Sequence, residues 1–213
     1  MMMITRPEHD PTTKYISCWS TIVLEAAKKA KIECVDLWRK KANRKDFEGR
    51  MRKLEPSLVV IQGHGNAQTI TGHDNEPLVT AGENESVLAG KITYAVSCEA
   101  AKDLGERIAK NPDTTFIGYN DKFVFTQQNE KWHRPIDDDR AKPFMETSNQ
   151  VPLTLIKGHD CHNAYERSQE VGKTHFRRLM TSVADPDALL DAQCLWWNLK
   201  HQVCLGDGFK KMI

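Results

Sequence analysis

Two reactive side chains each follow a short apolar run in this chain. His64 stands between two glycines after Leu58–Gln62, and Cys98 comes shortly after Ile92–Val96. Continuous β-branched runs without alternation are typical of strands that a parallel sheet buries on both faces. The carboxyl ends of neighbouring parallel strands meet at one edge, where open α/β sheets place their sites. The pattern therefore predicts that His64 and Cys98 lie at the same sheet edge.

A cysteine beside a histidine indicates nucleophilic catalysis. The thiolate is the nucleophile, and the imidazole withdraws the thiol proton and later protonates the leaving amine. Gly65 leaves room for a substrate carbonyl, and its backbone N–H and that of Cys98 are candidates for an oxyanion hole. Glu99–Lys110 is expected to form a helix whose amino-terminal dipole favours the thiolate. A glycine turn and a buried structural cysteine are the alternative interpretation, but the two strand-end residues together favour the His64–Cys98 dyad.

The surrounding motifs resemble those of a known superfamily. Val-Ile-Gln-Gly-His-Gly, Tyr-Ala-Val-Ser-Cys and the later Phe-Ile-Gly-Tyr look like the blocks of caspase-like (clan CD) cysteine peptidases, and they are closer to the gingipain and CHAT branch than to caspases. The chain has Val96-Ser97-Cys98 in place of the caspase Gln-Ala-Cys signature, and its His–Cys spacing is shorter than the ~50 residues of caspases. The resemblance is specific over about Leu58–Phe125, extends back to Met1 and is weak beyond Gln150, and it does not imply acid-specific cleavage.

The resemblance also implies where substrate binds. In this superfamily the pocket for the residue before the cleaved bond is built from the loop after the first strand, the residues before the cysteine and the loop after the next strand. The substrate-binding candidates in these places are Arg6, Asp10, Ser97 and Asp121. The two aspartates would pair with a substrate Arg or Lys, whereas Arg6 or Lys122 would invert that preference. The resemblance slightly favours cleavage after basic residues.

Composition limits the class of protein. With 213 residues, 39% of them hydrophobic, we expect a single caspase-like domain over 1–213, with the sheet core and site in 1–150 and a helical part in 151–213. Thirty basic and 29 acidic residues argue against a nucleic-acid or anionic-membrane partner. We expect neither a signal peptide nor a membrane-spanning run, and the six cysteines form no CxxC pair. We therefore expect a cytoplasmic protein with reduced thiols and without a cofactor or metal.

Strands and helices alternate along the sequence. This alternation predicts an α/β fold with three layers, a mostly parallel central sheet and a helical carboxyl-terminal segment. Thr12 or Thr13 is expected to cap the first helix, and Gln127–Gln150 is expected to be an irregular loop. The other expected elements are strands at Met1–Thr5, Ile32–Leu37 and Thr114–Tyr119, with Phe123–Phe125 continuing the last strand or pairing beside it; helices at Asp46–Leu54, Ser86–Gly90, Asn163–Met180 and Pro186–Val203; and a small hairpin or flap at Thr69–Asp74.

Other functions compete with the peptidase. His73-Asp74 and the pair His159 and His162 offer metal-ligand side chains, although no HExxH motif or cysteine pair supports a metal-dependent hydrolase. A caspase-like domain can also be a catalytically silent interaction or regulatory module. A thiol hydrolase that acts on a non-peptide acyl group would use the same dyad as a peptidase. The leading hypothesis is a cysteine endopeptidase with a protein or peptide substrate.

Control of such a peptidase is predicted from the same pattern. Only a helix and a tight connection separate Cys98 from the next strand, which leaves no room for the cleavable linker of caspases. CHAT-type peptidases are commonly governed by a partner or a sensor domain. The resemblance therefore favours a regulatory protein partner, with Gln127–Gln150 and the apolar carboxyl-terminal helix around Trp196 and Trp197 as the candidate docking elements.

Overall fold

The computed structural model describes residues 1–181 and 186–212. Its strands are β1 (Met2–Arg6), β2 (Cys34–Trp38), β3 (Leu58–Gln62), β4 (Thr69–Thr71), β5 (Pro77–Thr80), β6 (Ile92–Val96), β7 (Thr115–Tyr119) and β8 (Gln202–Gly206). Its α-helices are α1 (Pro11–Trp19), α2 (Thr21–Lys29), α3 (Arg44–Leu54), α4 (Asp103–Ala109), α5 (Lys142–Ile156), α6 (Cys161–Met180) and α7 (Ala188–His201). Short 3-10 turns are η1 (Arg39–Lys41), η2 (His73–Asn75), η3 (Glu85–Leu88), η4 (Asn129–Lys131) and η5 (Pro135–Asp137).

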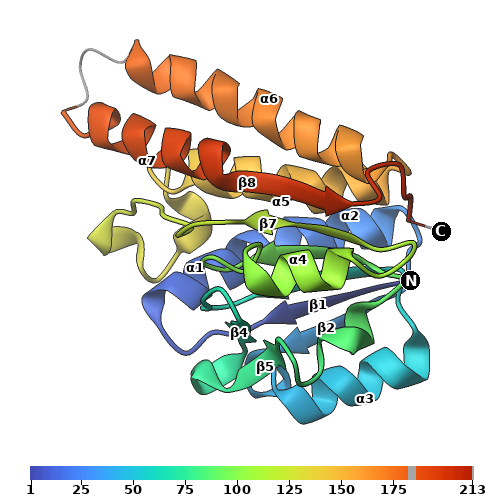
Figure 1. Cartoon of the computed structure of the whole chain (residues 1–213). Helices are drawn as coiled ribbons and strands as arrows, with labels where there is room; N and C mark the ends of the chain where they lie inside the picture. Colours follow the sequence, from blue (N-terminus) through green and yellow to red (C-terminus); the bar gives the residue numbers. More distant parts are fainter. Residues whose placement is uncertain (182–185, 213) are drawn as a thin grey trace.

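The central sheet is mostly parallel. Its six described strands lie in the order β2-β1-β3-β6-β7-β8, and only β8 runs antiparallel to its neighbour (Figure 1). The order places β3 and β6, the two strands that precede His64 and Cys98, side by side near the middle. Both strands are fully buried, as their continuous apolar sequences predict.

Helices cover both faces of the sheet. One apolar core lies between the sheet and α1, α2, α5 and the start of α6, and includes Tyr15, Val23 and Leu155. The other core lies between the sheet and α3, α4 and the β4–β5 hairpin, and includes Phe47 and Leu104. Helix α7 packs on α5 and α6 outside the first helical layer (Figure 1). The predicted three-layer α/β fold is confirmed.

The carboxyl-terminal third differs from the sequence prediction. Residues 142–150, expected to be irregular, belong to α5, whose polar side chains include a buried Asn149 that donates to the Trp19 carbonyl. The expected helix to Val203 ends at His201, and the chain then forms the edge strand β8. The predicted start of that helix is Pro186, whereas α7 begins at Ala188; the preceding Asp185 lies outside the described residues. The polar sequence of residues 142–150 did not predict a buried helix, because these polar side chains are buried only through contacts with distant parts of the chain.

Two further predictions are wrong, those of the first helix and of the strand at Phe123–Phe125. The first helix is capped by Asp10, with Pro11 in its first turn, and the expected single helix is two helices joined at Ser20. Phe123–Phe125 is not a strand. The Asn198 side chain instead pairs with both backbone groups of Val124, at 2.9 Å to its N–H and 2.6 Å to its carbonyl, as a strand partner would.

Candidate active site

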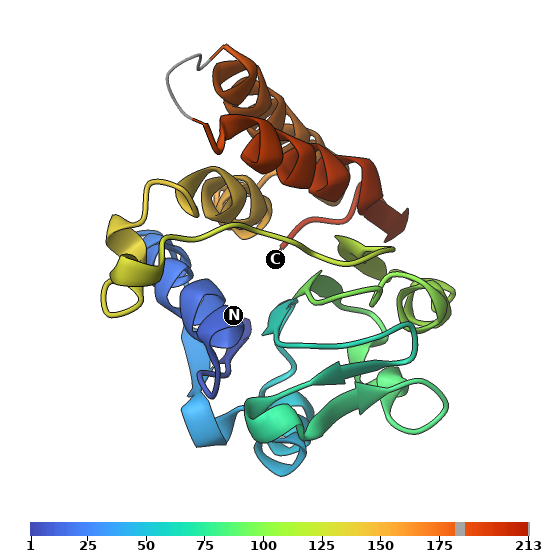
Figure 2. The same ribbon diagram turned by 90° about the vertical axis from the view of Figure 1, so that its left-hand side faces the viewer.

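His64 and Cys98 lie at the carboxyl edge of the sheet, seen end-on in Figure 2. The last register pair of β3 and β6 is Gln62 with Val96, so each reactive residue comes two positions after a paired strand end. The Gly63 backbone N–H continues this pairing by donating to the Val96 carbonyl at 3.3 Å. The in-register ends therefore bring the two predicted dyad segments together.

Close contact between the two segments requires a glycine at position 65. A Cβ atom there would lie 2.2 Å from the Ser97 Oγ, 2.6 Å from the Thr69 carbonyl oxygen and 3.5 Å from the Cys98 carbonyl oxygen. Within the described part of the chain, neither the Gly65 nor the Cys98 backbone N–H has a hydrogen-bond acceptor. Both predicted oxyanion donors are thus adjacent to one another in the fold and unused by it.

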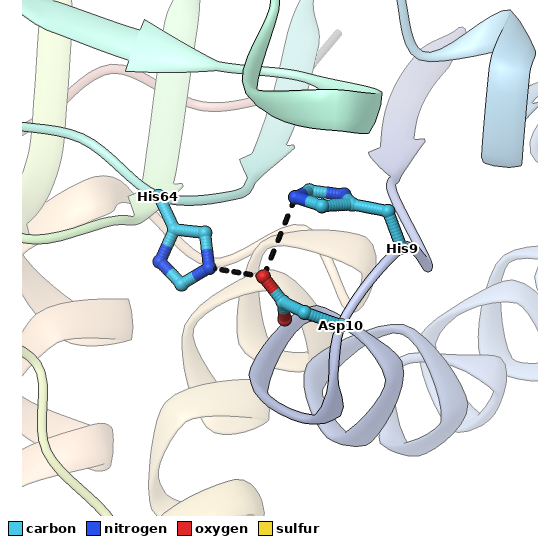
Figure 3. A group of neighbouring side chains, drawn as sticks. All are labelled: His9, Asp10 and His64. Atoms are coloured by element: carbon cyan, nitrogen blue, oxygen red, sulfur yellow. Dashed lines mark hydrogen bonds and ion pairs between the residues drawn. The ribbon is translucent and has the colours of Figure 1, made fainter.

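Asp10 holds His64 from the other side. The Asp10 Oδ2 lies 2.6 Å from the His64 Nε2, and the Asp10 Oδ1 accepts the Thr13 backbone N–H at 2.8 Å as the cap of α1. Burial pushes the pKa of Asp10 upward, but hydrogen bonds from Thr13 and His64 outweigh it and leave that pKa below its usual value. Because a carboxylate only accepts, the proton of a neutral His64 is on Nε2. The Nδ1 atom then carries a lone pair and faces away from Asp10 (Figure 3).

Two more histidines lie behind this pair. The His9 Nε2 is 3.3 Å from the Asp10 Oδ2 and 3.3 Å from the Asn75 Oδ1. The His9 and His73 rings meet edge to face with centroids 5.3 Å apart. His9 is almost completely buried, whereas His64 keeps 38% of its side chain exposed. His64 is therefore the histidine of this group that is open to a substrate.

Cys98 is half-buried and carries its thiol 3.9 Å from the Phe123 carbonyl oxygen. Burial raises the pKa of the Cys98 thiol, so the resting side chain is a neutral thiol. The expected helix dipole at Cys98 is absent, because α4 begins only at Asp103, after a turn in which Glu99 adopts φ 57°. Activation of this thiol therefore needs a general base, and the sequence-based expectation of a thiolate favoured by the helix is wrong.

The turn after Cys98 is fixed by the end of β7. The Glu99 backbone N–H donates to the Asp121 carbonyl, and the Ala101 N–H donates to the Tyr119 carbonyl, both at 3.0 Å. The Asp121 carboxylate accepts the Lys122 backbone N–H at 2.7 Å. Asp121 thus lies beside the nucleophile segment.

The other substrate-binding candidates have different surroundings. Ser97 is buried against Gly65, and its Oγ has no hydrogen-bond partner among the described residues. Arg6 is only 8% exposed and forms a two-point ion pair with Asp36, at 2.9 and 2.6 Å, and a bond to the Ser17 carbonyl. Its guanidinium is engaged in the fold, so the assignment of Arg6 to substrate binding has no support from the structure. Asp10 is engaged with His64, a role that sequence reasoning missed.

The metal-ligand pairs predicted from the sequence do not form a cluster. His73 lies 3.7 Å from Asp74, while His159 and His162 are exposed at the start of α6. Within residues 1–181 and 186–212, three side chains instead share one potential ion site, those of His9, Asp10 and His64. A signal in the sequence was the adjacency of His9 and Asp10 in the loop after the first strand, at the same sheet edge as His64.

The comparison with solved structures identifies the fold. The crystal structure of the Arg-specific cysteine proteinase gingipain R matches 99% of this chain with a TM-score of 0.60 and 10% sequence identity. The chain has a caspase-like fold. It spans about half the length of that proteinase, since the match covers 46% of the gingipain chain.

The comparisons by sequence add no family assignment. No protein-family model matches the chain, and no curated protein matches it in sequence. At 10% identity the likeness to gingipain R concerns the fold, and it supports neither the CHAT branch nor a particular specificity. The structure also bears on membrane association: of the helices in the described ranges, none is both long and apolar enough to cross a bilayer.

Proposed function

We propose that this chain is a cysteine peptidase in which Asp10, His64 and Cys98 act in series. The observation that carries the proposal is the in-register pairing of β3 and β6, which puts the His64 and Cys98 segments side by side at the carboxyl edge. The bond between Asp10 and His64 adds the orienting partner that a catalytic imidazole needs. The fold shared with a cysteine proteinase is consistent with this chemistry.

The mechanism starts from a neutral thiol. The Nδ1 of His64 accepts the Cys98 proton as the sulfur attacks the scissile carbonyl carbon, and Asp10 stabilises the imidazolium that forms. The carbonyl oxygen gains negative charge and is held by the N–H groups of Gly65 and Cys98. His64 then donates the proton to the leaving amine, and water hydrolyses the thioester by the reverse sequence. The raised pKa of Cys98 makes His64 a required general base, because little thiolate exists without it.

Cleavage by the purified chain and by Cys98→Ala and His64→Ala variants tests this proposal. Each variant is expected to abolish hydrolysis of a peptide library, while Cys194→Ala, which removes another half-buried thiol, retains it. Circular dichroism checks that all variants fold. Cleavage that persists in a folded Cys98→Ala protein would refute the dyad. Hydrolysis of small thioesters or esters without peptide cleavage would indicate a non-peptide acyl substrate.

Specificity for basic residues is a second part of the proposal. The carboxylates of Asp103, Glu106 and Asp121 line one surface hollow beside α4. Lys102 also lines this hollow, but its ammonium is paired with Glu99 at 2.7 Å. The local charge therefore favours a cationic side chain, and Asp121 is the member of the group that contacts the Cys98 turn.

Matched charge-neutralising variants test this preference. We expect Asp121→Asn to lower kcat/KM for substrates with Arg or Lys before the cleaved bond by about 10- to 150-fold, the value of one charge-assisted hydrogen bond. Asp137→Asn, which removes an exposed carboxylate elsewhere, should leave kcat/KM unchanged. A library profile dominated by Asp or Glu would overturn the proposed preference.

Control by a protein partner completes the proposal. Helix α7 exposes Leu189, Leu190 and Trp196, and each of these residues is at least half exposed. We expect the isolated chain to remain at full length, to be monomeric or weakly associated, and to have low activity. Mass spectrometry after prolonged incubation tests this expectation. A Cys98-dependent cut within Asp137–Lys142 that raises activity would identify a self-processing zymogen instead.

A further inference from the structure

The His9, Asp10 and His64 side chains point toward one another at the sheet edge (Figure 3). One donor atom from each lies within 4.8 Å of the other two. Two imidazole nitrogens and a carboxylate oxygen are the donor set of many three-residue zinc sites, which leave a fourth position for water. We propose that this trio binds a Zn²⁺ ion, and that the ion inhibits the chain by removing His64 from its catalytic arrangement.

The geometry fits such an ion with a small adjustment. Two ligands at about 2.0–2.1 Å from a tetrahedral zinc lie roughly 3.3–3.4 Å apart. The distance from His9 Nε2 to Asp10 Oδ2 is already 3.3 Å. The His64 Nε2 lies 2.6 Å from the same oxygen and would have to move outward by several tenths of an ångström. His64 is 38% exposed, so its ring has space to make this movement.

The backbone already fixes two of the three ligands. Asp10 caps α1, and His9 is held in place by its own backbone N–H, which donates to the Thr13 hydroxyl at 3.2 Å. Its ring packs against His73, so it has little freedom to turn away. A partly preformed site loses less conformational entropy on binding an ion. The His9 Nδ1 is buried and has no hydrogen-bond partner among the described residues. No bond to this atom therefore has to break when the Nε2 of the same ring binds an ion.

Zinc binding and the proposed catalysis are mutually exclusive. Zinc takes the lone pair of the His64 Nε2 after the proton on that nitrogen leaves, and it also takes the Asp10 oxygen that orients the ring. The proton that leaves Nε2 moves to Nδ1, and a protonated Nδ1 has no lone pair with which to accept the Cys98 proton. The inhibitory part of this inference rests on the proposed peptidase, whereas the binding part does not.

Direct binding measurements are the first test. Zinc is added to the metal-free full chain in competition with a chromophoric chelator, and we expect one ion per chain. His9→Gln and His64→Gln should each weaken binding by more than the ~10- to 100-fold that loss of an outer-shell partner costs. His162→Gln is the matched control, since it removes an exposed histidine that lies 3.4 Å from Glu166 on α6. Unchanged affinity in a folded His64→Gln protein would overturn the site.

A thiol is the competing zinc ligand, and Cys98→Ala separates the two. We expect this variant to keep full zinc affinity. Cobalt substituted for zinc should give the visible bands of nitrogen and oxygen ligation without the near-ultraviolet band of a thiolate. A strong thiolate band, lost in Cys98→Ala, would mean that the ion binds the cysteine and that the proposed trio is wrong.

Activity is measured last and separately. Micromolar zinc should suppress peptide cleavage reversibly by chelator, and the ratio of activities without and with zinc should fall toward one in His9→Gln. Stoichiometric binding to the trio in a chain that cleaves nothing would retain the metal site and reject the peptidase. Cleavage that zinc leaves unchanged while the trio is occupied would reject the inhibitory role.

Discussion

Replacing Asp10 by asparagine separates the two tasks of this side chain. One oxygen caps α1 through the Thr13 N–H, and the other orients His64. Asparagine caps a helix as well as aspartate does, so the free energy of unfolding should change by less than about 0.5 kcal/mol. It cannot supply the charge that stabilises the imidazolium, and it offers an amide that allows the wrong tautomer. Activity should therefore fall while stability does not.

The magnitude follows from the bond that is lost. A hydrogen bond to a charged group contributes about 1.5–3 kcal/mol, which corresponds to a roughly 10- to 150-fold fall in kcat/KM. The full loss of about 10⁴ seen for a buried aspartate in a serine protease triad is not expected, because 27% of the Asp10 side chain is exposed and water shares the interaction. Steady-state kinetics and urea unfolding of the same samples measure the two effects.

A second capping aspartate provides the control. Asp160 caps α6 through the Asn163 N–H at 2.8 Å, in the same manner but away from His64. Asp160→Asn should change neither activity nor stability, and Asp160→Ala and Asp10→Ala should each cost about 1 kcal/mol of stability. If Asp10→Asn leaves kcat/KM unchanged, or lowers it no more than Asp160→Asn does, the orienting role is refuted.

Two further substitutions probe the surroundings of the site. Gly65→Ala places a Cβ 2.2 Å from the Ser97 Oγ and should cost about 1–3 kcal/mol of stability and most of the activity. Gly49→Ala on α3, where a Cβ has nothing within 4 Å, should instead stabilise by about 0.4–1 kcal/mol. Equal thermal shifts for the two variants would contradict this expectation. Asp36→Ala leaves the buried Arg6 guanidinium without its carboxylate partner and should destabilise by about 2–4 kcal/mol without changing the cleavage-site profile; an altered profile would return Arg6 to the substrate pocket.

The sheet could be predicted because each of its central strands has a recognisable local sequence pattern. Leu58–Gln62 and Ile92–Val96 are mostly apolar, with Gln62 and Thr93 as polar members, and the structure has both strands with these boundaries. Their parallel pairing followed from the alternation of strands and helices. Helix α5 could not be found in this way, since its buried Asn149 and Ser148 look like loop residues until their partners, the Trp19 carbonyl and Tyr94, are in place.

The residues of the candidate site could be predicted from the sequence, but their pKa values could not. Positions of His64 and Cys98 at one edge follow from strand order alone. The raised pKa of Cys98 does not, because it depends on how deeply the thiol is buried; nor does the turn that delays α4 until Asp103 and leaves Cys98 without a helix dipole. That turn requires φ 57° at Glu99, a backbone conformation that is uncommon for a residue other than glycine and has no signature in the local sequence.

Asp10 has a role in the fold, as the cap of α1, and a role in the proposed chemistry, as the partner of His64. Its backbone position is set by the end of β1 and the start of α1, so the carboxylate reaches His64 only when the first strand and β3 are paired. The same carboxylate keeps a pKa below its usual value, so the stability it contributes is present above the unfolded value near 3.9 and is lost as the pH falls through the lower folded value. Asp10 therefore remains an anion throughout the neutral range in which His64 must accept a proton, and the cap of one helix serves as the fixed charge of the site.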